Sequence, residues 1–286
     1  MPKAPPPPPP TMAKAPPPPR PNGNNAQAQA FPSKPLTVQK GRTLKIQKTV
    51  IYGSGGIGKS ELCANIAQLG IEPLFFDLDM ETGHLPIARV NISDWQELLT
   101  GLRQRDLWEP YQCVVIDSAT KAEEYATRWV IANVKHEKPE KVPFIRGIED
   151  YGWAKGYTHV YETFLLLLQE LDAIVRSGRH VILTAHDCVA NAPNPEGEEW
   201  IRYEPRLLAH KHASIRHRLK EWAFHVLFIG YDISVANRKA TGAGTRTIYT
   251  HERPTFLAKS RTLPDQDIPY AKGDATLWRL MLGKEQ

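Results

Sequence analysis

Short apolar runs alternate with longer segments of helical spacing from residue 43 onward. The apolar runs lie at residues 48–52, 73–78, 113–116 and 181–184. The segments with helical spacing lie at residues 59–69, 93–104, 119–135, 157–176 and 206–222. Short strands that are apolar on both faces, with helices between them, are typical of a parallel sheet covered on both sides. The pattern therefore predicts an α/β fold with a mostly parallel sheet.

Three further strand-like runs follow the last of these helices. They lie at residues 226–229, 245–249 and 256–258, and Gly242 and Gly244 stand between two of them. Glycines between neighbouring strands favour a reversal of the chain. We therefore expect an antiparallel extension at the C-terminal end of the sheet.

The first 42 residues differ from the rest, which predicts a disordered basic arm ahead of one domain spanning residues 43–286. Residues 1–35 hold 14 of the 25 prolines, and residues 1–48 hold eight Lys and Arg with no Asp or Glu. Proline runs form polyproline II and carry too few large apolar groups to fold. The remaining 28 basic residues are outnumbered by 31 acidic ones, so the positive charge of the chain belongs to this arm. The arm is either a solvated tail or a docking peptide for a partner.

The apolar segments also bear on where the protein resides. No run of 18 apolar residues is present, which argues against a transmembrane helix, and the N-terminus lacks the apolar core of a signal peptide. The three cysteines are odd in number and widely spaced, which fits a reducing compartment better than a disulfide framework. We expect a cytoplasmic protein that has no contact with a membrane.

Residues 53–60, GSGGIGKS, fit the phosphate-binding pattern G-x-x-x-x-G-K-[ST] and stand between a predicted strand and a predicted helix. In that position backbone N–H groups surround a phosphate, and the helix N-terminus adds its partial positive charge. Lys59 would reach the β- and γ-phosphates of ATP, and Ser60 would ligate Mg²⁺. The predicted nucleotide-binding residues are Gly53, Ser54, Gly55, Gly56, Ile57, Gly58, Lys59, Ser60 and Glu61.

Acidic residues end two of the later strands. Asp117 closes the apolar run VVID, where an aspartate beside a phosphate loop is placed to hold Mg²⁺. Asp79 and Glu81 follow the run 73–78, and they would share a side with Asp77 if the strand continued. Hydrolysis needs a carboxylate beside the attacking water, for which Asp79 is the first choice and Glu81 the second. The alternative is that these acids cap the next segment.

His186 follows the strand 181–184 and is the fourth polar element at this end of the predicted sheet. A side chain there could contact the γ-phosphate and report its loss to the following loop, with Thr184 behind it. A single histidine can equally serve as a structural hydrogen-bonding group.

The order of these motifs resembles the core of the RecA-like ATPases, and more closely the phage-encoded group that includes the Sak-type single-strand annealing proteins. The resemblance covers about residues 48–264 and is carried by GSGGIGKS, FFDLD, YQCVVIDSAT, IEDYGWAKGY, HVILTAH, LKEWAFHVLF and FLAKSRTLP. It implies an oligomeric Mg²⁺-dependent ATPase that acts on single-stranded DNA in a bacterial host. It also suggests a single-strand-binding protein or another replication protein as a partner for the arm.

Three positions depart from the pattern that the resemblance implies. Asp79 stands where a glutamate usually lies beside the water, which shortens the side chain by one methylene. His186 stands where recombinases often have glutamine, and Phe224 stands where this group has an aspartate. The resemblance further implies that basic residues on a late strand reach the γ-phosphate of a neighbouring subunit. Lys259 and Arg261 fit that role, although they could also form a solvated sheet edge.

Two loop-like segments contain several basic residues and are candidates for contact with DNA. Residues 135–157 interleave cations with aromatic residues, a combination that suits an unpaired strand because bases stack and phosphates pair. Residues 188–220 follow His186 directly and end in a cluster of basic residues. The first segment could instead be a surface crossover whose aromatic residues pack on the core, and the second could be one solvated helix face. The predicted DNA-binding residues are Arg146, Trp153, Lys155, Arg206, Lys211, Arg216 and Arg218.

The leading hypothesis is an oligomeric Mg²⁺-ATPase that binds single-stranded DNA and promotes annealing or strand exchange, with DNA stimulating hydrolysis. One alternative is a scaffold that binds single-stranded DNA under control of the nucleotide and has negligible turnover. Another is a small-molecule kinase that uses the same phosphate loop.

Overall fold

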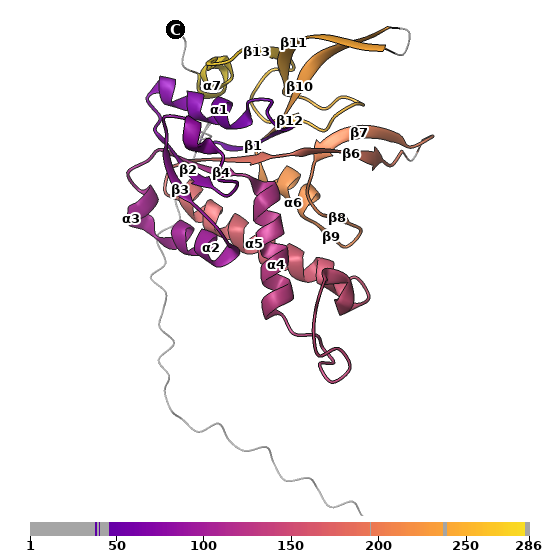
Figure 1. The fold of residues 1–286 in the computed structure, drawn as a ribbon. Coiled ribbons are helices and arrows are strands. Elements are labelled where there is room, and N and C mark those ends of the chain that lie inside the picture. Colours follow the sequence, from indigo (N-terminus) through magenta and orange to yellow (C-terminus); the bar gives the residue numbers. More distant parts are fainter. Residues whose placement is uncertain (1–37, 39, 41–45, 195, 237–238, 284–286) are drawn as a thin grey trace, which may run out of the picture. The chain divides into compact units, whose positions relative to one another are not determined.

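The computed structural model describes residues 38, 40, 46–194, 196–236 and 239–283 (Figure 1). Contacts within the chain divide it into two units, Met1–Thr43 and Leu44–Gln286. The predicted disordered arm lies outside the described residues except for Val38 and Lys40. All the helices and strands below belong to the second unit.

A sheet of nine strands forms the centre of this unit, counted over the described residues. Its order is β13-β11-β10-β1-β5-β4-β2-β3, and β12 pairs with β10. The strands from β10 to β3 run parallel, whereas β11, β12 and β13 are antiparallel to their neighbours. The predicted fold class, a mostly parallel sheet with an antiparallel C-terminal extension, is therefore confirmed. The strands of the sheet are β1 (Lys48–Gly53), β2 (Pro73–Asp77), β3 (Ala88–Asn91), β4 (Cys113–Asp117), β5 (His180–Ala185), β10 (His225–Ala236), β11 (Lys239–Tyr249), β12 (Lys259–Ser260) and β13 (Asp267–Tyr270).

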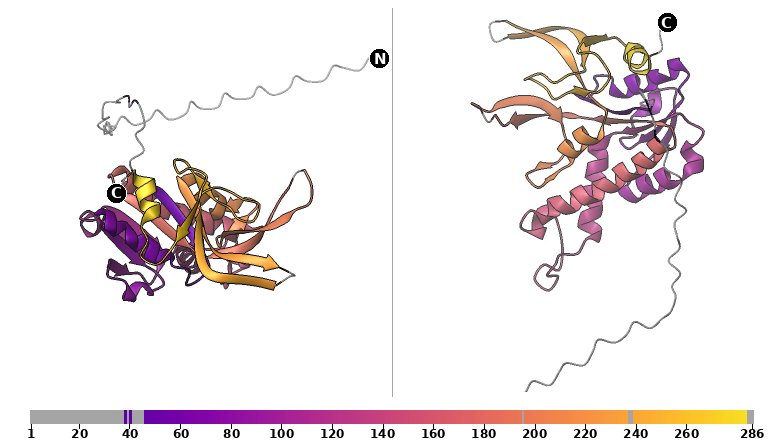
Figure 2. Two further views of the ribbon diagram at one scale, coloured as in Figure 1. Left: turned by 90° about the horizontal axis from the view of Figure 1, so that it is seen from above. Right: turned by 180° about the vertical axis from the view of Figure 1, so that it is seen from behind.

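Helices cover both faces of the sheet because the central strands are apolar on both sides (Figures 1 and 2). Successive side chains of a strand point to opposite faces. Val50 of β1 accordingly packs in the cluster that includes α2, α4, α5 and α6, whereas Ile51 packs in the cluster that includes α1 and α7. The helices are α1 (Lys59–Ala64), α2 (Trp95–Arg103), α3 (Arg105–Trp108), α4 (Ala119–Asn133), α5 (Lys155–Arg176), α6 (Ile215–Trp222) and α7 (Thr276–Leu282), with 3₁₀ turns η1 (Asn65–Leu69), η2 (Thr82–His84) and η3 (Ile148–Tyr151).

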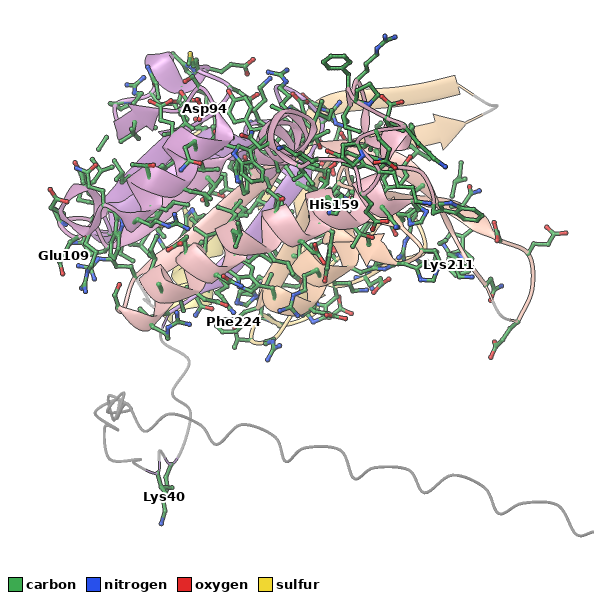
Figure 3. The ribbon with its side chains drawn as sticks, turned by 90° about the horizontal axis from the view of Figure 1, so that it is seen from below. Lys40, Asp94, Glu109, His159, Lys211 and Phe224 are labelled. Atoms are coloured by element: carbon green, nitrogen blue, oxygen red, sulfur yellow. The ribbon has the colours of Figure 1, made fainter. Side chains whose placement is uncertain are left out.

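Three of the helices begin at a side chain that caps the first turn. Asp94, labelled in Figure 3, accepts a hydrogen bond from the backbone N–H of Glu97 (2.8 Å) at the start of α2. Ser118 caps α4 and Ser214 caps α6 in the same way. Such caps satisfy backbone donors that the helix itself leaves unpaired. Asp94 thus fixes the start of the helix expected at 93–104.

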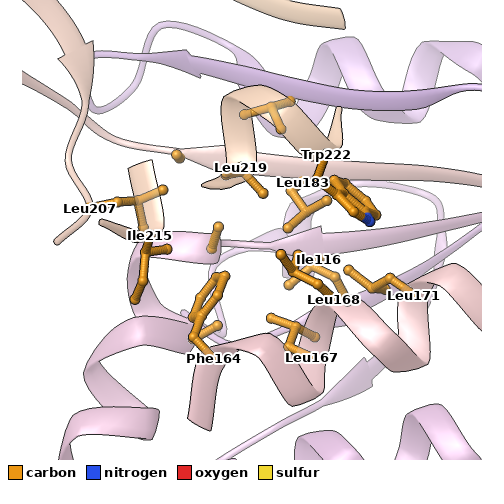
Figure 4. Packing of buried hydrophobic residues seen from close by; sticks show 14 of the residues in the cluster. Ile116, Phe164, Leu167, Leu168, Leu171, Leu183, Leu207, Ile215, Leu219 and Trp222 are labelled. Carbon is orange, nitrogen blue, oxygen red and sulfur yellow. The ribbon is translucent and has the colours of Figure 1, made fainter. Parts of the chain in front are cut away.

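The larger apolar cluster lies between the sheet and the long helix α5. Phe164, Leu167 and Leu171 of α5 are fully buried and face Ile116 and Leu183 of the sheet (Figure 4). Their spacing along the helix places them on one face. This packing fixes β4 and β5, whose carboxyl ends carry Asp117 and His186.

The sequence misplaced several elements outside this core. The helix expected at 206–222 begins only at Ile215, and residues before it form the short strands β8 (Ala209–His210) and β9 (Ala213–Ser214). A hairpin of β6 (Asp187–Ala192) and β7 (Trp200–Pro205) precedes them and was not predicted. The strand expected at 256–258 is instead the approach to β12, and β3, β13 and α7 were missed. No helix in the described part of the chain has the length and apolar character needed to cross a bilayer.

Candidate functional site

The phosphate loop joins the carboxyl end of β1 to the first turn of α1, as predicted. Gly56 and Gly58 hold positive φ angles of 73° and 102°, which side chains with a Cβ atom rarely adopt. A Cβ atom on Gly58 would also lie 2.8 Å from Nη1 of Arg246. Arg246 donates to the carbonyl of Ile57 (2.8 Å), and the hydroxyl of Tyr270 donates to the carbonyl of Gly58 (3.1 Å). These two hydrogen bonds fix the carbonyl groups of the loop, while its glycines line the cleft.

The Lys59 side chain turns into the loop. Its Nζ donates to the carbonyls of Gly53 (2.9 Å) and Ser54 (2.8 Å), and only 8 % of the residue is exposed. Burial lowers the pKa of Lys59, while the nearby Asp117 carboxylate opposes that change. The ammonium group is thus anchored beside the space where the loop would hold a phosphate.

Ser60 and Asp117 lie together although 57 residues separate them in sequence. The Ser60 hydroxyl donates to Oδ2 of Asp117 (2.5 Å), and the hydroxyl of Thr184 donates to Oδ1. Burial raises the pKa of Asp117, and the two donated hydrogen bonds oppose the rise. A hydroxyl and a carboxylate oxygen are hard ligands of the kind that Mg²⁺ takes, so this pair fits the predicted metal role.

The three acids Asp77, Asp79 and Glu81 all line one cleft, but they do not alternate along one strand, so the premise of a continuing strand was wrong. The strand ends at Asp77, and Met80 has a positive φ of 57°. Asp77 is buried and accepts hydrogen bonds from Thr82 and from the backbone N–H of Glu81, so it closes the turn. Asp79 faces the loop and accepts from the Ser118 hydroxyl (2.9 Å). Glu81 is exposed.

His186 lies at the end of β5, half-buried beside the same cleft. Its backbone N–H donates to the hydroxyl of Thr120 (3.0 Å), and its carbonyl accepts from the N–H of Arg206 (2.8 Å). Burial, Lys59 and Arg206 lower the pKa of His186, which keeps the ring neutral near pH 7. The residue therefore joins the cleft to both α4 and the base of the β6–β7 hairpin.

These groups border one cleft of about 250 Å³ at the carboxyl ends of the parallel strands. Ligands of open α/β sheets bind at this edge. Sequence reasoning missed the residues that position the site, because their contacts follow from strand register. They are Ser118, Thr120, Arg246 and Tyr270, together with the hydrogen bond of Thr184.

The late basic pair lies elsewhere. Lys259 pairs with Val226 near the amino end of β10, whereas the phosphate loop follows the carboxyl end of β1. Its Nζ donates to the carbonyls of Lys220 (2.5 Å) and Ala223 (2.8 Å) at the end of α6. Arg261 is exposed, and its guanidinium lies 5.2 Å from the ring centre of Phe224. Neither residue joins the nucleotide cleft of its own chain, and a role toward a neighbour stays a prediction.

The first predicted DNA segment is partly structural. Tyr151 is buried and donates to the carbonyls of Val130 (2.9 Å) and Val134 (2.7 Å), so it belongs to the core. Trp153 is 96 % exposed and has a positive φ of 48°. Lys155 pairs with Glu137, whereas the side chain of Arg146 is exposed. The segment thus presents two exposed aromatic side chains, Phe144 (78 % exposed) and Trp153, and Trp153 lies just before α5.

The second predicted DNA segment also divides in two. Arg216 is turned inward: it pairs with the buried Glu204 and donates to the carbonyls of Pro205 and Leu207, so its assignment to DNA was wrong. Arg206, Lys211 and Arg218 are exposed (Figure 3 labels Lys211). The two segments meet where Tyr157 stacks on His210, with ring centres 4.8 Å apart and planes 4° from parallel.

Glu123 gives this region a predicted dependence on pH. It lies on α4 and accepts a hydrogen bond from the backbone N–H of Leu208 (2.7 Å). Burial raises its pKa from 4.5 to about 7, while that hydrogen bond and the nearby Arg216 and Arg206 oppose the rise. The folded chain therefore binds an extra proton between these values, and its free energy of unfolding falls as the pH rises through them.

We expect Glu123→Gln to remove much of this dependence. The unfolding free energy of the variant should exceed that of the natural chain by about 1–2 kcal/mol at pH 8 and differ little at pH 5. The gain at pH 8 is smaller than about 1.36 kcal/mol multiplied by the whole pKa shift, because Glu123 is partly exposed. Urea denaturation at both pH values measures the difference. Equal shifts at pH 5 and pH 8 would contradict the raised pKa.

A family model covers most of this unit. Residues 45–262 match the family AAA_24, described as an AAA domain. No curated protein matches the chain. Among solved structures, a KaiC-like protein from Pyrococcus horikoshii OT3 is 13% identical over 79% of this chain and 89% of its own, with a TM-score of 0.37. The flagellar accessory protein FlaH from Methanocaldococcus jannaschii is 11% identical (71% and 78% covered, TM-score 0.34), and the RadB recombinase is 14% identical (71% and 81% covered, TM-score 0.37).

Proposed function

Because the chain belongs to the AAA domain family AAA_24, we propose that it hydrolyses ATP with Mg²⁺ and couples hydrolysis to single-stranded DNA. The observation that supports this most is the meeting of Lys59, Ser60, Asp117, Asp79 and His186 around one cleft, although they come from four separate strand ends. Backbone N–H groups of the loop and Lys59 would hold the phosphates of ATP. Ser60 and Asp117 would hold Mg²⁺, which neutralises charge on the phosphates when bound.

Asp79 and His186 would act on the far side of the γ-phosphate. Asp79 offers a carboxylate that can accept a proton from water or orient it. The neutral ring of His186 can donate a hydrogen bond to a phosphate oxygen. Because its backbone is bonded to Thr120 and Arg206, a shift of the ring on loss of the γ-phosphate would pass to the neighbouring segments.

The surface around Trp153 and Lys211 is our candidate for single-stranded DNA. The Tyr157–His210 stack brings together the two segments that the sequence selected. Trp153 offers a free aromatic face, and Arg206, Lys211 and Arg218 supply exposed positive charge. Stacking of bases with pairing of phosphates is the usual basis for binding an unpaired strand. Annealing or strand exchange by an oligomer is the task that fits such a surface.

Measuring ATP hydrolysis with and without single-stranded DNA tests the proposal. We expect the single strand to stimulate phosphate release and Lys59→Ala to abolish it, with a loss of about 100-fold or more because the group that contacts the β- and γ-phosphates is removed. Binding of ATP without phosphate release would favour a scaffold gated by the nucleotide. Hydrolysis indifferent to DNA, with no DNA binding, would refute the coupling.

A charge-matched pair of variants tests the DNA surface. Lys211→Ala should weaken binding to an unstructured oligonucleotide and lower the salt dependence by about one ion, because one phosphate contact is lost. The control is Arg105→Ala, which removes an exposed cation from α3. Equal effects of the two variants would show general attraction rather than a defined surface.

A further inference from the structure

Two hairpins carry most of the large apolar side chains that are exposed among the described residues. The β6–β7 and β10–β11 hairpins both project from the helical body on one side (Figures 1 and 2). Eleven large apolar side chains are exposed in the described part of the chain, and six belong to these hairpins. They are Val189, Trp200, Ile201, Tyr203, Tyr231 and Ile233. Such a concentration marks an interaction surface rather than scattered exposure.

An aromatic groove of about 570 Å³ lies between the bases of the hairpins. Tyr203 stacks on Phe228, with ring centres 5.3 Å apart and planes 15° from parallel, and Phe228 stacks in turn on Phe256 (5.1 Å). Tyr203 and Tyr231 are 42 % and 45 % exposed, so the groove is open where these rings stand. Its inner end reaches Ser54 of the phosphate loop.

The charge of the β6–β7 wall of the groove favours a basic occupant. Asp187 lines it, and Asp232 stands between the lining residues Tyr231 and Ile233. Residues 187–205 hold five acids and one arginine, and that residue, Arg202, is already paired with Glu204 (2.7 Å) and Glu252 (2.5 Å). This wall repels phosphate groups, which disfavours DNA along it. It suits a ligand with apolar rings and flanking cations.

Residues 5–20 of this chain have that chemistry. They contain the proline runs 5–10 and 16–19, with Lys14 between the runs and Arg20 directly after the second. Proline rings of a polyproline II segment pack on aromatic faces, and the segment loses little entropy because it is already extended. We propose that the groove binds residues 5–20 of another copy of the chain as a polyproline II segment. That the segment comes from another copy rests on the oligomer proposed above, whereas the match between segment and groove does not.

The rest of the arm is long enough for such an exchange. Residues 21–45 can extend to about 80 Å, whereas a unit of this size has a radius of gyration of only about 18 Å. An arm can therefore reach the groove of an adjacent copy. In an assembly, tethering would raise the local concentration of the segment and offset a modest affinity.

Photo-crosslinking of the full chain tests the proposal. Benzophenone-bearing phenylalanine replaces Met12, which lies between the proline runs, and a matched version carries it at Phe31, outside the docking segment. Isotopically heavy and light copies are mixed before illumination, and the linked peptides are identified by mass. We expect Met12 to link between copies to peptides containing Tyr203 or Tyr231, and Phe31 to link there much less.

Variants of each side give the second readout. Tyr203→Ala with Tyr231→Ala, or Lys14→Glu with Arg20→Glu, should lower the Met12 yield about 5-fold, equivalent to roughly 1 kcal/mol. The aromatic control Trp153→Ala should leave it unchanged. The proposal would be overturned if no links form, if links form only to other surfaces, or if they form only within one copy. It would also be overturned if an oligonucleotide displaced the arm and itself became linked to Tyr203. ATP hydrolysis by the Lys14→Glu, Arg20→Glu chain reports the proposed function separately, since neither residue is near the nucleotide site in sequence.

Discussion

Replacing Asp79 with asparagine is expected to lower the kcat for ATP hydrolysis by about 100-fold or more, with ATP affinity changed less than about 3-fold. The side chain lines the same cleft as Lys59 and is held there by the Ser118 hydroxyl. The amide keeps the size and the hydrogen bond but cannot accept a proton. Steady-state hydrolysis, together with equilibrium binding of ATP, separates the two effects.

The dependence of the hydrolysis rate on pH provides a second test of Asp79. Burial raises the pKa of Asp79 above its usual value, although the Ser118 hydrogen bond and His186 oppose the rise. The carboxylate must be deprotonated to act, so the rate should fall as the pH drops through this raised pKa, and Asp79→Asn should lose that limb. Glu81→Gln is the comparison, because Glu81 lines the same cleft but is more exposed than Asp79, and it should change kcat by less than about 3-fold. A larger loss in Glu81→Gln than in Asp79→Asn would reverse the assignment.

Replacing Gly156 with alanine is expected to cost about 3 kcal/mol of unfolding free energy or more. Gly156 is buried at the start of α5, and a Cβ atom there would lie 2.0 Å from the carbonyl oxygen of Ile148 in η3. The obstacle is backbone, so it cannot move aside as a side chain would. A thermal melt should show a decrease in Tm of about 6–12 °C for a unit of this size.

Gly147 provides the matched control for this change. It directly precedes Ile148 at the start of η3, has an extended φ of −154°, and a Cβ atom there would meet nothing within 4 Å. Gly147→Ala should therefore change the unfolding free energy by about 0.5 kcal/mol or less. Similar losses in both variants would mean that η3, rather than the close approach at Gly156, governs the result.

The sequence was informative wherever burial leaves a simple pattern. β1, β2, β4 and β5 are apolar on both faces, so their runs stand out from the helices between them. The β6–β7 hairpin has the opposite character: its strands mix Ala, Asn and Glu, and most of its residues are not buried. Residues 206–222 have helical spacing, but the buried Leu207 and Ala213 are held by strands and turns before α6 begins.

The site divides in the same way. Lys59, Ser60 and Asp117 follow from local motifs, and the structure brings them together. The inward turn of Arg216 could not be read locally, because it depends on Glu204, a partner in an unpredicted hairpin. Thr184 reaches Asp117 only because β4 and β5 pair in register, which is a property of the sheet rather than of either segment.

The position of β1 in the sheet has a consequence for synthesis on the ribosome. β1 ends at Gly53, yet its two neighbours are β5, which ends at Ala185, and β10, which pairs with it through Ile229. At about 5–20 residues per second, roughly 7–26 seconds of translation separate β1 from the end of its first neighbour. During that interval the apolar strand that carries the phosphate loop has no strand beside it. Nascent chains that stop before β5 should therefore depend on chaperones and should not retain nucleotide.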